Sequence, residues 1–340
     1  AAAEITDGAL LILAGPGTGK TRTLTHRIAH LVRSRGLAPE ECLAITFTNR
    51  AANELRERLD PLLGKQARRV PVMTFHALGH RILREHAARA GLKPDFRVEE
   101  DVDFDGLIAR PARLLAEHAD LREAYRRRWR SISVDEYQDV DAEQYHLLRE
   151  LAPPGGDLCV IGDPDQAIYG FRGADVRIFQ RFAEDFPGAH TARLTRNYRS
   201  GRGIVRAALQ VIAPATLVVD RVLEALAVEE TRVVIHEAAS DKAEAAFVSR
   251  TIEQLLGGSS FHALDSGRAD GRAEQTLALA DFAVLVRTTA QADAMAAALV
   301  QAGLPVQRRS HEPLLETATA QEVLAAWQKA GKLSDGVMAA

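Results

Sequence analysis

A glycine-rich turn that directly follows a short apolar run constrains this chain more than any other feature. The run is Leu-Leu-Ile-Leu-Ala at 10–14, and Gly-Pro-Gly-Thr-Gly-Lys-Thr follows it at 15–21. Glycines let consecutive backbone N–H groups turn toward one anion, and the N-terminus of a following helix adds positive potential. With Ala14 in the first glycine position, the spacing is that of a phosphate-binding P-loop between a strand and a helix.

The P-loop predicts a nucleoside triphosphate and Mg²⁺ as ligands. Lys20 is expected to reach the outer phosphates, and the Thr21 hydroxyl is expected to hold the metal ion. The alternative is a glycine-rich turn that binds nothing. The predicted nucleotide-binding residues are Ala14, Gly15, Pro16, Gly17, Thr18, Gly19, Lys20 and Thr21.

Further apolar runs predict the sheet that carries this loop. They are four to six residues long and continuously apolar, which is typical of parallel strands covered on both faces. Amphipathic stretches at 20–34 and 50–63 predict helices between them. The fold class is therefore α/β, a parallel sheet flanked by helices. The runs lie at 10–14, 42–47, 70–75, 131–135 and 157–162, with a further candidate at 189–194.

The chain of 340 residues is longer than one core comfortably serves, so more than one domain is expected. Residues 78–130 are expected to form helices without a buried strand. The predicted organisation is a first domain at 1–77 and 131–202, a short helical insertion at 78–130, and a second α/β domain at 203–340. In that second domain we expect strands at 232–236 and 282–286, helices at 242–256 and 290–302, and a long loop at 257–272.

Two adjacent acids end the apolar run at 131–135. Asp135 is expected to hold Mg²⁺ through water, and Glu136 is expected to act as the base that orients the attacking water. The alternative is a solvated acidic turn at a strand end.

The segment 162–174 follows another apolar run, at an end of the sheet that faces the ligand crevice in doubly wound folds. Gln166 can hydrogen-bond the γ-phosphate or the attacking water. Tyr169 and Phe171, with Arg172 beside them, predict a platform on which the bases of a single strand stack. The alternative is that both aromatic rings belong to the core.

Net charge and cysteine content indicate how this chain could bind nucleic acid and in which cellular compartment it is found. The net charge is −3, so nucleic-acid binding requires a local basic surface. Cys42 and Cys159 each lie in an apolar run, which predicts buried, reduced thiols and a cytoplasmic protein. No stretch reaches the roughly 18 apolar residues of a membrane span, so no membrane partner is expected.

Several segments together resemble the motifs of UvrD/Rep-like superfamily 1 DNA helicases. The segment 46–52 is similar to motif Ia, 74–77 to motif Ib, and 134–139, 162–174 and 194–200 to motifs II, III and IV. The segment 280–288 resembles the part of the second motor domain that follows motif IV. The sequences are Thr-Phe-Thr-Asn-Arg-Ala-Ala, Thr-Phe-His-Ala, Val-Asp-Glu-Tyr-Gln-Asp, Gly-Asp-Pro-Asp-Gln-Ala-Ile-Tyr-Gly-Phe-Arg-Gly-Ala, Leu-Thr-Arg-Asn-Tyr-Arg-Ser and Ala-Asp-Phe-Ala-Val-Leu-Val-Arg-Thr.

This resemblance implies a RecA-like ATPase domain, a partial second RecA-like domain, and further site residues. Arg22 and Tyr198 would sandwich the adenine, Gln166 would couple the γ-phosphate to the DNA groove, and Arg199 would act as an arginine finger. The implied activity is an ATP-dependent DNA helicase or translocase that moves 3′ to 5′ and hydrolyses ATP to ADP and phosphate. The residues that would line the path of single-stranded DNA are Phe47, Asn49, His76, Tyr169, Phe171 and Arg172.

The implied partners are single-stranded DNA, junctions of single- and double-stranded DNA, and repair or replication proteins. The chain departs from the family pattern at both ends and in the insertion. The glutamine-bearing segment before the P-loop and motifs V and VI are not present, and the insertion after Phe75 is short. We therefore interpret the chain as a fragment with reduced or no unwinding on its own.

Three alternatives remain open from the sequence. They are a module that binds nucleotide and DNA without turnover, the motor part of a helicase–nuclease complex, and an RNA-directed relative.

Overall fold

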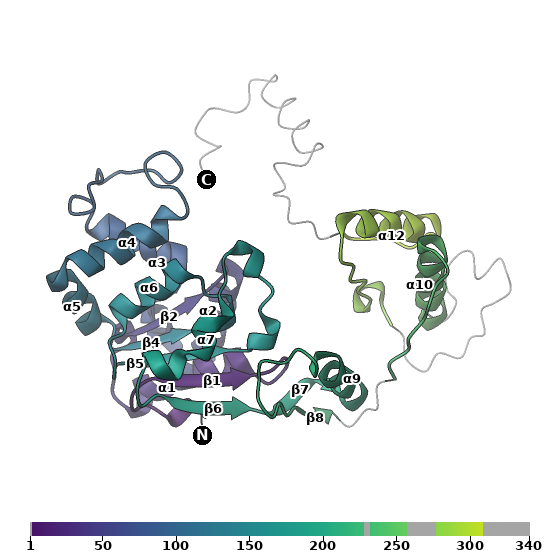
Figure 1. Cartoon of the computed structure of the whole chain (residues 1–340), viewed down its shortest axis with the longest axis horizontal. Coiled ribbons are helices and arrows are strands. Elements are labelled where there is room, and N and C mark those ends of the chain that lie inside the picture. The colour runs from purple at the N-terminus through teal and green to yellow at the C-terminus, as the bar shows by residue number, and fades with distance from the viewer. Residues whose placement is uncertain (1, 228–231, 257–276, 309–340) are drawn as a thin grey trace, which may run out of the picture. The chain divides into compact units, whose positions relative to one another are not determined.

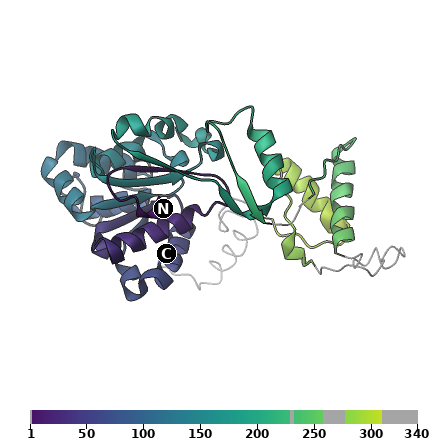
Figure 2. The ribbon, with the colours of Figure 1, turned by 90° about the horizontal axis from the view of Figure 1, so that it is seen from below.

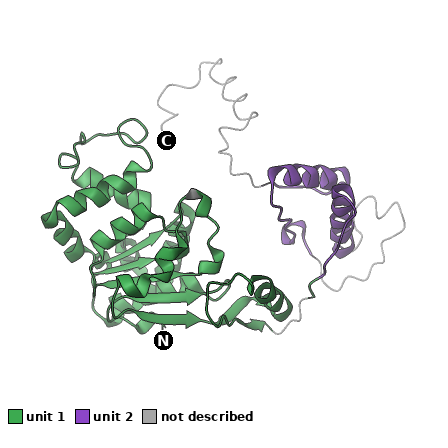
Figure 3. Ribbon diagram, in the orientation of Figure 1, with its two compact units in different colours: residues 1–233 green, residues 234–340 purple. Residues whose placement is uncertain are grey.

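The structure, a computed structural model, describes residues 2–227, 232–256 and 277–308. The chain divides into two compact units at 1–233 and 234–340, shown in green and purple in Figure 3. The division falls about thirty residues after the predicted boundary near residue 203.

The first unit is built on a six-stranded sheet in which every pair of neighbouring strands is parallel. The strand order is β3-β2-β4-β5-β1-β6 (Figure 1). The predicted α/β fold with a parallel sheet flanked by helices is confirmed. The strands are β1 (Leu10–Ala14), β2 (Cys42–Thr46), β3 (Val72–Thr74), β4 (Ser131–Val134), β5 (Asp157–Gly162) and β6 (His190–Leu194).

Alternation of side chains along the strands explains why these runs are continuously apolar. Leu11 and Val160 belong to the core on one face of the sheet, while Ile12 and Ile161 belong to the core on the other. In Figure 2 the strands lie between purple helices on one side and teal helices on the other. A strand covered on both faces must be apolar at every position, which is the pattern that the sequence shows.

Two helices cover one face of the sheet, and a larger group covers the other. Helices α1 (Lys20–Ser34) and α2 (Asn49–Leu63) pack on the face that also holds Cys42 and Cys159. Both cysteines are buried free thiols, as predicted. The opposite face is covered by α3 (Phe75–Glu85), α4 (Gly106–Glu117), α5 (Ala119–Arg128), α6 (Ala142–Leu151), α7 (Val176–Gln180) and α8 (Phe182–Asp185).

The order of the strands places the P-loop at the point where the direction of strand addition in the sheet reverses. The connection from β1 through α1 leads to β2, which β5 and β4 separate from β1, whereas β6 lies on the other side of β1. In open parallel sheets a crevice forms at such a point, outside the carboxyl ends of the strands. Loops that follow β1, β4 and β5 therefore converge there.

The helical insertion contains no β-strand between residues 78 and 130, as predicted. An irregular stretch at 86–105 precedes α4 and includes one isolated bridge between Val98 and Val102. Its buried Phe96 and Val102 form a small core with Leu83 and Leu107.

The first unit ends with a small βαβ element. Strands β7 (Arg196–Gly201) and β8 (Glu224–Ala227) pair in parallel, and helix α9 (Arg202–Ile212) connects them. Short 3₁₀ helices complete this unit: η1 (Ala2–Glu4), η2 (Pro39–Glu41), η3 (Gly64–Arg69), η4 (Tyr137–Asp139), η5 (Pro164–Gln166) and η6 (Gly170–Arg172).

The second unit contains the two predicted helices, each shifted by one residue. Helices α10 (Asp241–Leu255) and α12 (Thr289–Gln301) pack through a core that includes Ile252 and Leu299. A 3₁₀ helix, η7, spans Leu279–Asp281. The predicted loop at 257–272 lies outside the described residues.

The strands predicted at 232–236 and 282–286 are wrong. Both segments are described, and neither is paired in a sheet. Apolar residues in them are exposed, and Ile235 and Leu285 are each 93% accessible. An apolar run becomes a strand only where a neighbouring strand satisfies its backbone N–H and C=O groups. Among the described residues no strand takes up these two segments.

None of the described helices combines the length and the apolar character that crossing a membrane requires.

Candidate active site

The predicted P-loop joins the end of β1 to the start of α1. Gly17 and Gly19 have φ angles of 68° and 88°, in a backbone region that residues with a Cβ rarely adopt. The Thr18 hydroxyl donates a hydrogen bond of 2.7 Å to the Gly15 carbonyl and closes the turn. Gly19 caps α1, so Lys20 and Thr21 occupy its first turn, where backbone N–H groups point outward. The loop therefore has the backbone shape that phosphate binding requires.

Three predicted chemical groups converge beside this loop. The ammonium Nζ of Lys20 lies 2.9 Å from Oε2 of Glu136 and 3.4 Å from Oε1 of Gln166. These side chains come from the ends of three different elements, α1, β4 and η5. Their convergence places a cation, a carboxylate and an amide around one point next to the P-loop.

Asp135 is the buried member of the acidic pair. It is 5% exposed, so the alternative of a solvated acidic turn does not describe it. Burial, and next the charge of Glu136, raise the pKa of Asp135 to about 7. Burial and Glu136 likewise raise the pKa of Asp139 to about 6. Both carboxyl groups are thus poorly compensated and would be stabilised by a nearby cation.

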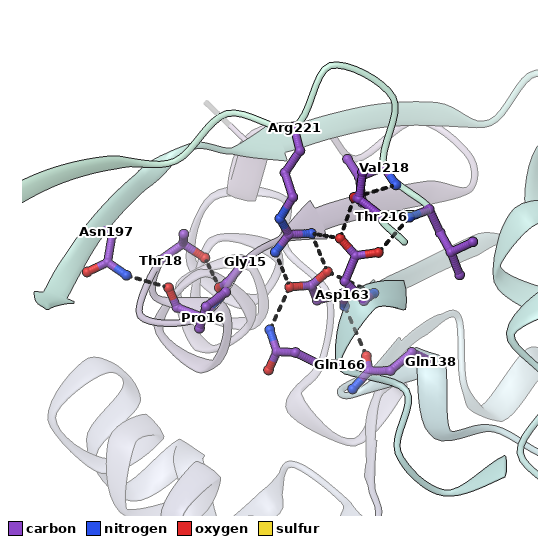
Figure 4. Close-up of polar contacts among 12 residues, drawn as sticks. Gly15, Pro16, Thr18, Gln138, Asp163, Gln166, Asn197, Thr216, Val218 and Arg221 are labelled. Atoms are coloured by element: carbon purple, nitrogen blue, oxygen red, sulfur yellow. Dashed lines mark hydrogen bonds and ion pairs between the residues drawn. The ribbon is translucent and has the colours of Figure 1, made fainter. Parts of the chain in front are cut away.

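A buried glutamine links the two acidic segments. Gln138 donates from Nε2 to Oε2 of Glu136 over 3.0 Å, and its Oε1 accepts a bond of 3.0 Å from the backbone N–H of Asp163. Glu136 itself adopts a left-handed backbone conformation with a φ of 48°. A non-glycine residue in that region is uncommon and is held there by its surroundings. Figure 4 shows Gln138 beside Asp163.

The segment 196–201 closes over the other side of the P-loop. Asn197 donates from Nδ2 to the Pro16 carbonyl over 2.7 Å, and the backbone N–H of Tyr198 donates to the Gly17 carbonyl over 2.9 Å. A Cβ on Gly17 would lie 2.7 Å from Nδ2 of Asn197, so only glycine fits. The exposed Tyr198 and Arg199 are therefore held next to the P-loop.

Arg22 lies in the first turn of α1 with an exposed side chain.

The aromatic residues predicted to meet DNA lie where β2, β3 and β5 end. Phe47 packs edge-on against Phe75 with ring centroids 5.6 Å apart. Tyr169 and Phe171 lie 6.2 Å apart by ring centroids and are 37% and 80% exposed. The alternative interpretation, that these two rings are core residues, is wrong because η5 and η6 carry them outward.

His76, another residue predicted to contact DNA, lies in the first turn of α3. His76 packs edge-on against the exposed Phe104, with ring centroids 5.8 Å apart. Burial raises the pKa of Asp141, and the nearby His76 lowers it by a smaller amount. Asp141 in turn forms an isolated β-bridge with Ala174, which directly follows the aromatic turn. His76 thus lies close to that turn.

Asn49 begins α2 and is exposed, and Arg172 lies in η6, although its side chain is outside the described part of the structure.

Models of two helicase domains match most of the chain. The UvrD/REP helicase N-terminal domain matches residues 1–102 and 97–187, and the UvrD-like helicase C-terminal domain matches residues 192–329. The chain belongs to the UvrD/Rep-like family of superfamily 1 helicases. The predicted family resemblance is therefore confirmed.

Individual members of the UvrD/Rep-like family are similar along the same residues. The ATP-dependent DNA helicase PcrA of Leuconostoc citreum is 33% identical over 376 residues, which cover 89% of this chain and 48% of that protein. PcrA of Staphylococcus aureus strain Mu50 is 31% identical, covering 89% and 49%, and PcrA of Bacillus subtilis strain 168 is 31% identical, covering 89% and 48%. The chain spans about half the length of these curated relatives.

Two contacts of this UvrD/Rep-like site were missed by the sequence reasoning. Asn197 was noted only as part of a motif, yet its side chain ties β7 to the P-loop. Arg221 was not noted at all, yet it pairs with Asp163 and Asp165 directly after β5 (Figure 4). The paired acids at 163 and 165 were a signal that a cation is needed, but nothing in the sequence identifies which one.

The raised pKa of Asp135 gives a prediction for stability against pH. Folding favours the protonated carboxyl, so its contribution to stability is most favourable below the unfolded pKa near 4 and is lost as pH rises to about 7. Asp135→Asn, without Mg²⁺ or nucleotide, should gain stability relative to wild type by up to about 1.4 kcal/mol per pH unit across that window. The difference should be constant above it.

Chemical denaturation at several pH values measures this difference. Asp60→Asn, on the exposed part of α2, is the matched control and should follow the wild-type profile. Equal stabilities of Asp135→Asn and wild type at every pH would show that Asp135 is not the buried, uncompensated acid described here.

Proposed function

We propose that this chain is the ATP-driven motor of a DNA helicase, which hydrolyses ATP to ADP and phosphate and moves 3′ to 5′ on single-stranded DNA. One observation carries the proposal. The ammonium of Lys20, the carboxylate of Glu136 and the amide of Gln166 meet beside the P-loop, and the exposed rings of Tyr169 and Phe171 follow Gln166 by three and five residues. A nucleotide-sensing group and a base-stacking surface thus lie on one short segment.

The phosphate site supports a division of labour among these residues. Lys20 and the turn 14–21 would hold the triphosphate. Glu136 would accept the proton of the attacking water, and Gln166 would orient that water. The Thr21 hydroxyl and the buried Asp135 carboxylate are oxygen donors of the kind that Mg²⁺ prefers, and Asp135 needs a cation to ionise readily. When bound there, Mg²⁺ would neutralise charge on the phosphates.

Among the described residues no cluster of three or more His, Cys, Asp or Glu is arranged to hold a metal. Such a cluster is not required in a P-loop site, where the phosphates complete the coordination.

The position of the residues around β7 supports roles in binding the adenine and in stabilising the transition state. Tyr198 is 60% exposed beside the P-loop, and Arg22 is exposed on α1. We propose that these two side chains sandwich the adenine. Arg199 would reach the γ-phosphate and stabilise the charge of the transition state. The Asn197 side chain bonds to Pro16, and the Tyr198 backbone bonds to Gly17. These two contacts keep Tyr198 and Arg199 next to the P-loop.

The ends of β2, β3 and β5 support a path for single-stranded DNA. Exposed aromatic rings accept stacked bases of any sequence, which suits a motor that must move along all sequences. We propose that the path is lined by Phe47, Asn49, His76, Tyr169, Phe171 and Arg172. A 3′-to-5′ motor on this path would displace streptavidin from the 5′ end of a biotinylated oligonucleotide and not from its 3′ end.

The domain organisation stays a proposal as well. Residues 1–77 and 131–202 would form the first RecA-like domain, 78–130 the insertion, and 203–340 part of the second. Repair or replication proteins in the cytoplasm would be the partners, and a helicase–nuclease complex is the alternative assembly.

Substitutions in the phosphate site separate binding from turnover. Lys20→Met should weaken ATP binding at least tenfold, because it removes the cation that faces the phosphates. Glu136→Gln should retain ATP binding but lower kcat by about 100-fold or more, because a positioned general base is lost. Fluorescent-nucleotide titration and steady-state phosphate release, each with and without oligothymidine, measure these effects.

The matched control is Lys65→Met, an exposed lysine on η3 that should behave as wild type. Phosphate release by the unsubstituted protein that no DNA accelerates would refute the motor proposal. Full turnover by Glu136→Gln would remove Glu136 from the catalytic role.

Substitutions in the aromatic turn test the DNA path. Tyr169→Ala and Phe171→Ala should each weaken binding of oligothymidine by about fivefold or more, because each stacked base contributes roughly 1–3 kcal/mol. Their affinity for ATP should not change. Fluorescence anisotropy with labelled oligonucleotide measures the first effect. Val211→Ala removes another strongly exposed apolar side chain, on α9, and serves as the control. Unchanged DNA affinity in both aromatic variants would place the path elsewhere.

A further inference from the structure

Arg221 is a buried arginine for which the proposed chemistry has no role. It lies in the connection between α9 and β8, and its side chain is 11% exposed. The guanidinium forms ion pairs of 2.6 Å with Asp163 and 2.7 Å with Asp165, whose side chains are 1% and 3% exposed. An arginine that is this buried and bridges two acids is fixed in place (Figure 4).

The contacts with Asp163 use both carboxylate oxygens. Nη1 of Arg221 donates to Oδ1 over 2.8 Å, and Nη2 donates to Oδ2 over 2.6 Å. Burial alone would raise the pKa of Asp163, but the hydrogen bonds from Arg221 and Gln166 outweigh it and hold the pKa below its usual value. Asp163 is therefore kept as a charged acceptor.

That charged acceptor and the Lys20 ammonium together orient the Gln166 amide. Nε2 of Gln166 donates to Oδ2 of Asp163 over 2.6 Å, and this leaves Oε1 facing Nζ of Lys20 at 3.4 Å. The reversed amide would set its carbonyl oxygen against a carboxylate, which repels it. A neutral carboxyl could donate to that oxygen, so the charge of Asp163 favours the observed orientation, as does the Lys20 ammonium that the amide oxygen faces. Arg221 in turn stabilises that charge through its two-point ion pair.

The second ion pair fixes the segment from which Arg221 comes. Asp165 accepts hydrogen bonds from the Thr216 hydroxyl over 2.5 Å and from the Leu217 backbone N–H over 2.6 Å. Leu223 follows and lies against the P-loop, where a Cβ on Gly15 would meet its Cδ2 at 2.7 Å. The chain is thus anchored both before and after Arg221, and this fixes the guanidinium beside Asp163.

We propose that Arg221 is a positioning residue for ATP hydrolysis. Its two-point ion pair fixes the Asp163 carboxylate and thereby holds the Gln166 amide with its acceptor oxygen toward the phosphate site. The inference rests on the proposed function, because it specifies how Gln166 meets the attacking water as an acceptor. It assigns Arg221 no contact with the nucleotide.

A cycle of substitutions tests whether Arg221 acts through Gln166. Arg221→Met should lower kcat roughly tenfold or more and leave the KM for ATP within about threefold, because binding by the P-loop is untouched. Arg221→Lys should recover part of kcat, since one charge remains without the bidentate geometry. In a Gln166→Ala background, Arg221→Met should change kcat less than about twofold, because the group that it positions is gone.

The control is Arg193→Met, an exposed arginine whose guanidinium donates to the Val219 carbonyl in the same neighbourhood. It should leave kcat and KM unchanged. If Arg221→Met acted only by impairing folding, its reduction of kcat would multiply with that of Gln166→Ala in the double variant. A multiplicative result, or a wild-type kcat in Arg221→Met, overturns the proposal.

Hydrogen exchange of the backbone separates this inference from the proposed function. Arg221→Met should speed exchange in peptides that cover 163–166 and 216–218, where the Asp165 and Leu217 amides donate to the two acids. Arg193→Met should not. If the protein releases no phosphate but exchange changes as expected, the proposed function fails while the positioning geometry stands. If the protein is an active ATPase and exchange in both peptides is unchanged, the positioning role fails alone.

Discussion

The charge balance around Lys20 and Arg221 is the interaction on which the rest of this site depends. Acidic groups gather at one edge of the sheet because β4 and β5 both end there, and the side chains of Asp135, Asp163 and Asp165 are almost fully buried. Lys20 meets Glu136, while Arg221 meets Asp163 and Asp165. Asp135 and Asp139 are left with raised pKa values of about 7 and 6. Carboxylates in surplus beside the P-loop are suited to holding a divalent cation, which would supply compensating positive charge.

In the proposed motor, the same edge would provide a physical route between the nucleotide and the DNA. Gln166 touches Lys20 through its oxygen, and the chain then turns outward through η5 and η6 to present Tyr169 and Phe171. Only a few residues separate the two, so a shift of Gln166 on binding or release of a phosphate would be passed on to the proposed stacking surface. Asp163 and Asp165, which precede Gln166, are anchored by Arg221, so the segment has a fixed end and an exposed end. This is the arrangement that a motor needs in order to couple a small chemical change to its grip on a strand.

Local patterns in the sequence predicted much of this structure, and contacts between distant residues explain what they missed. The P-loop and the strands at 10–14 and 157–162 were predictable because glycine geometry and two-sided burial leave their mark on consecutive residues. The strands predicted at 232–236 and 282–286 failed because pairing depends on a partner strand and not on the apolar run itself. Tyr169 and Phe171 could not be assigned to core or surface from spacing, since only the turns of η5 and η6 decide where the rings point. The role of Arg221 could not be predicted from the sequence, because its partners lie about fifty-eight residues earlier in the chain.

Coupling between the two sites is the central claim, and equilibrium binding measures it most directly. The affinity for a non-hydrolysable ATP analogue with Mg²⁺ should be determined without and with saturating oligothymidine, and the affinity for oligothymidine without and with the analogue. Linkage requires the two ratios to be equal, and coupling of this kind typically changes affinity by about 5- to 150-fold. The account predicts equal ratios that differ clearly from one. Two ligands that bind tightly with ratios of one would contradict it, because the phosphate site and the aromatic turn would then act independently.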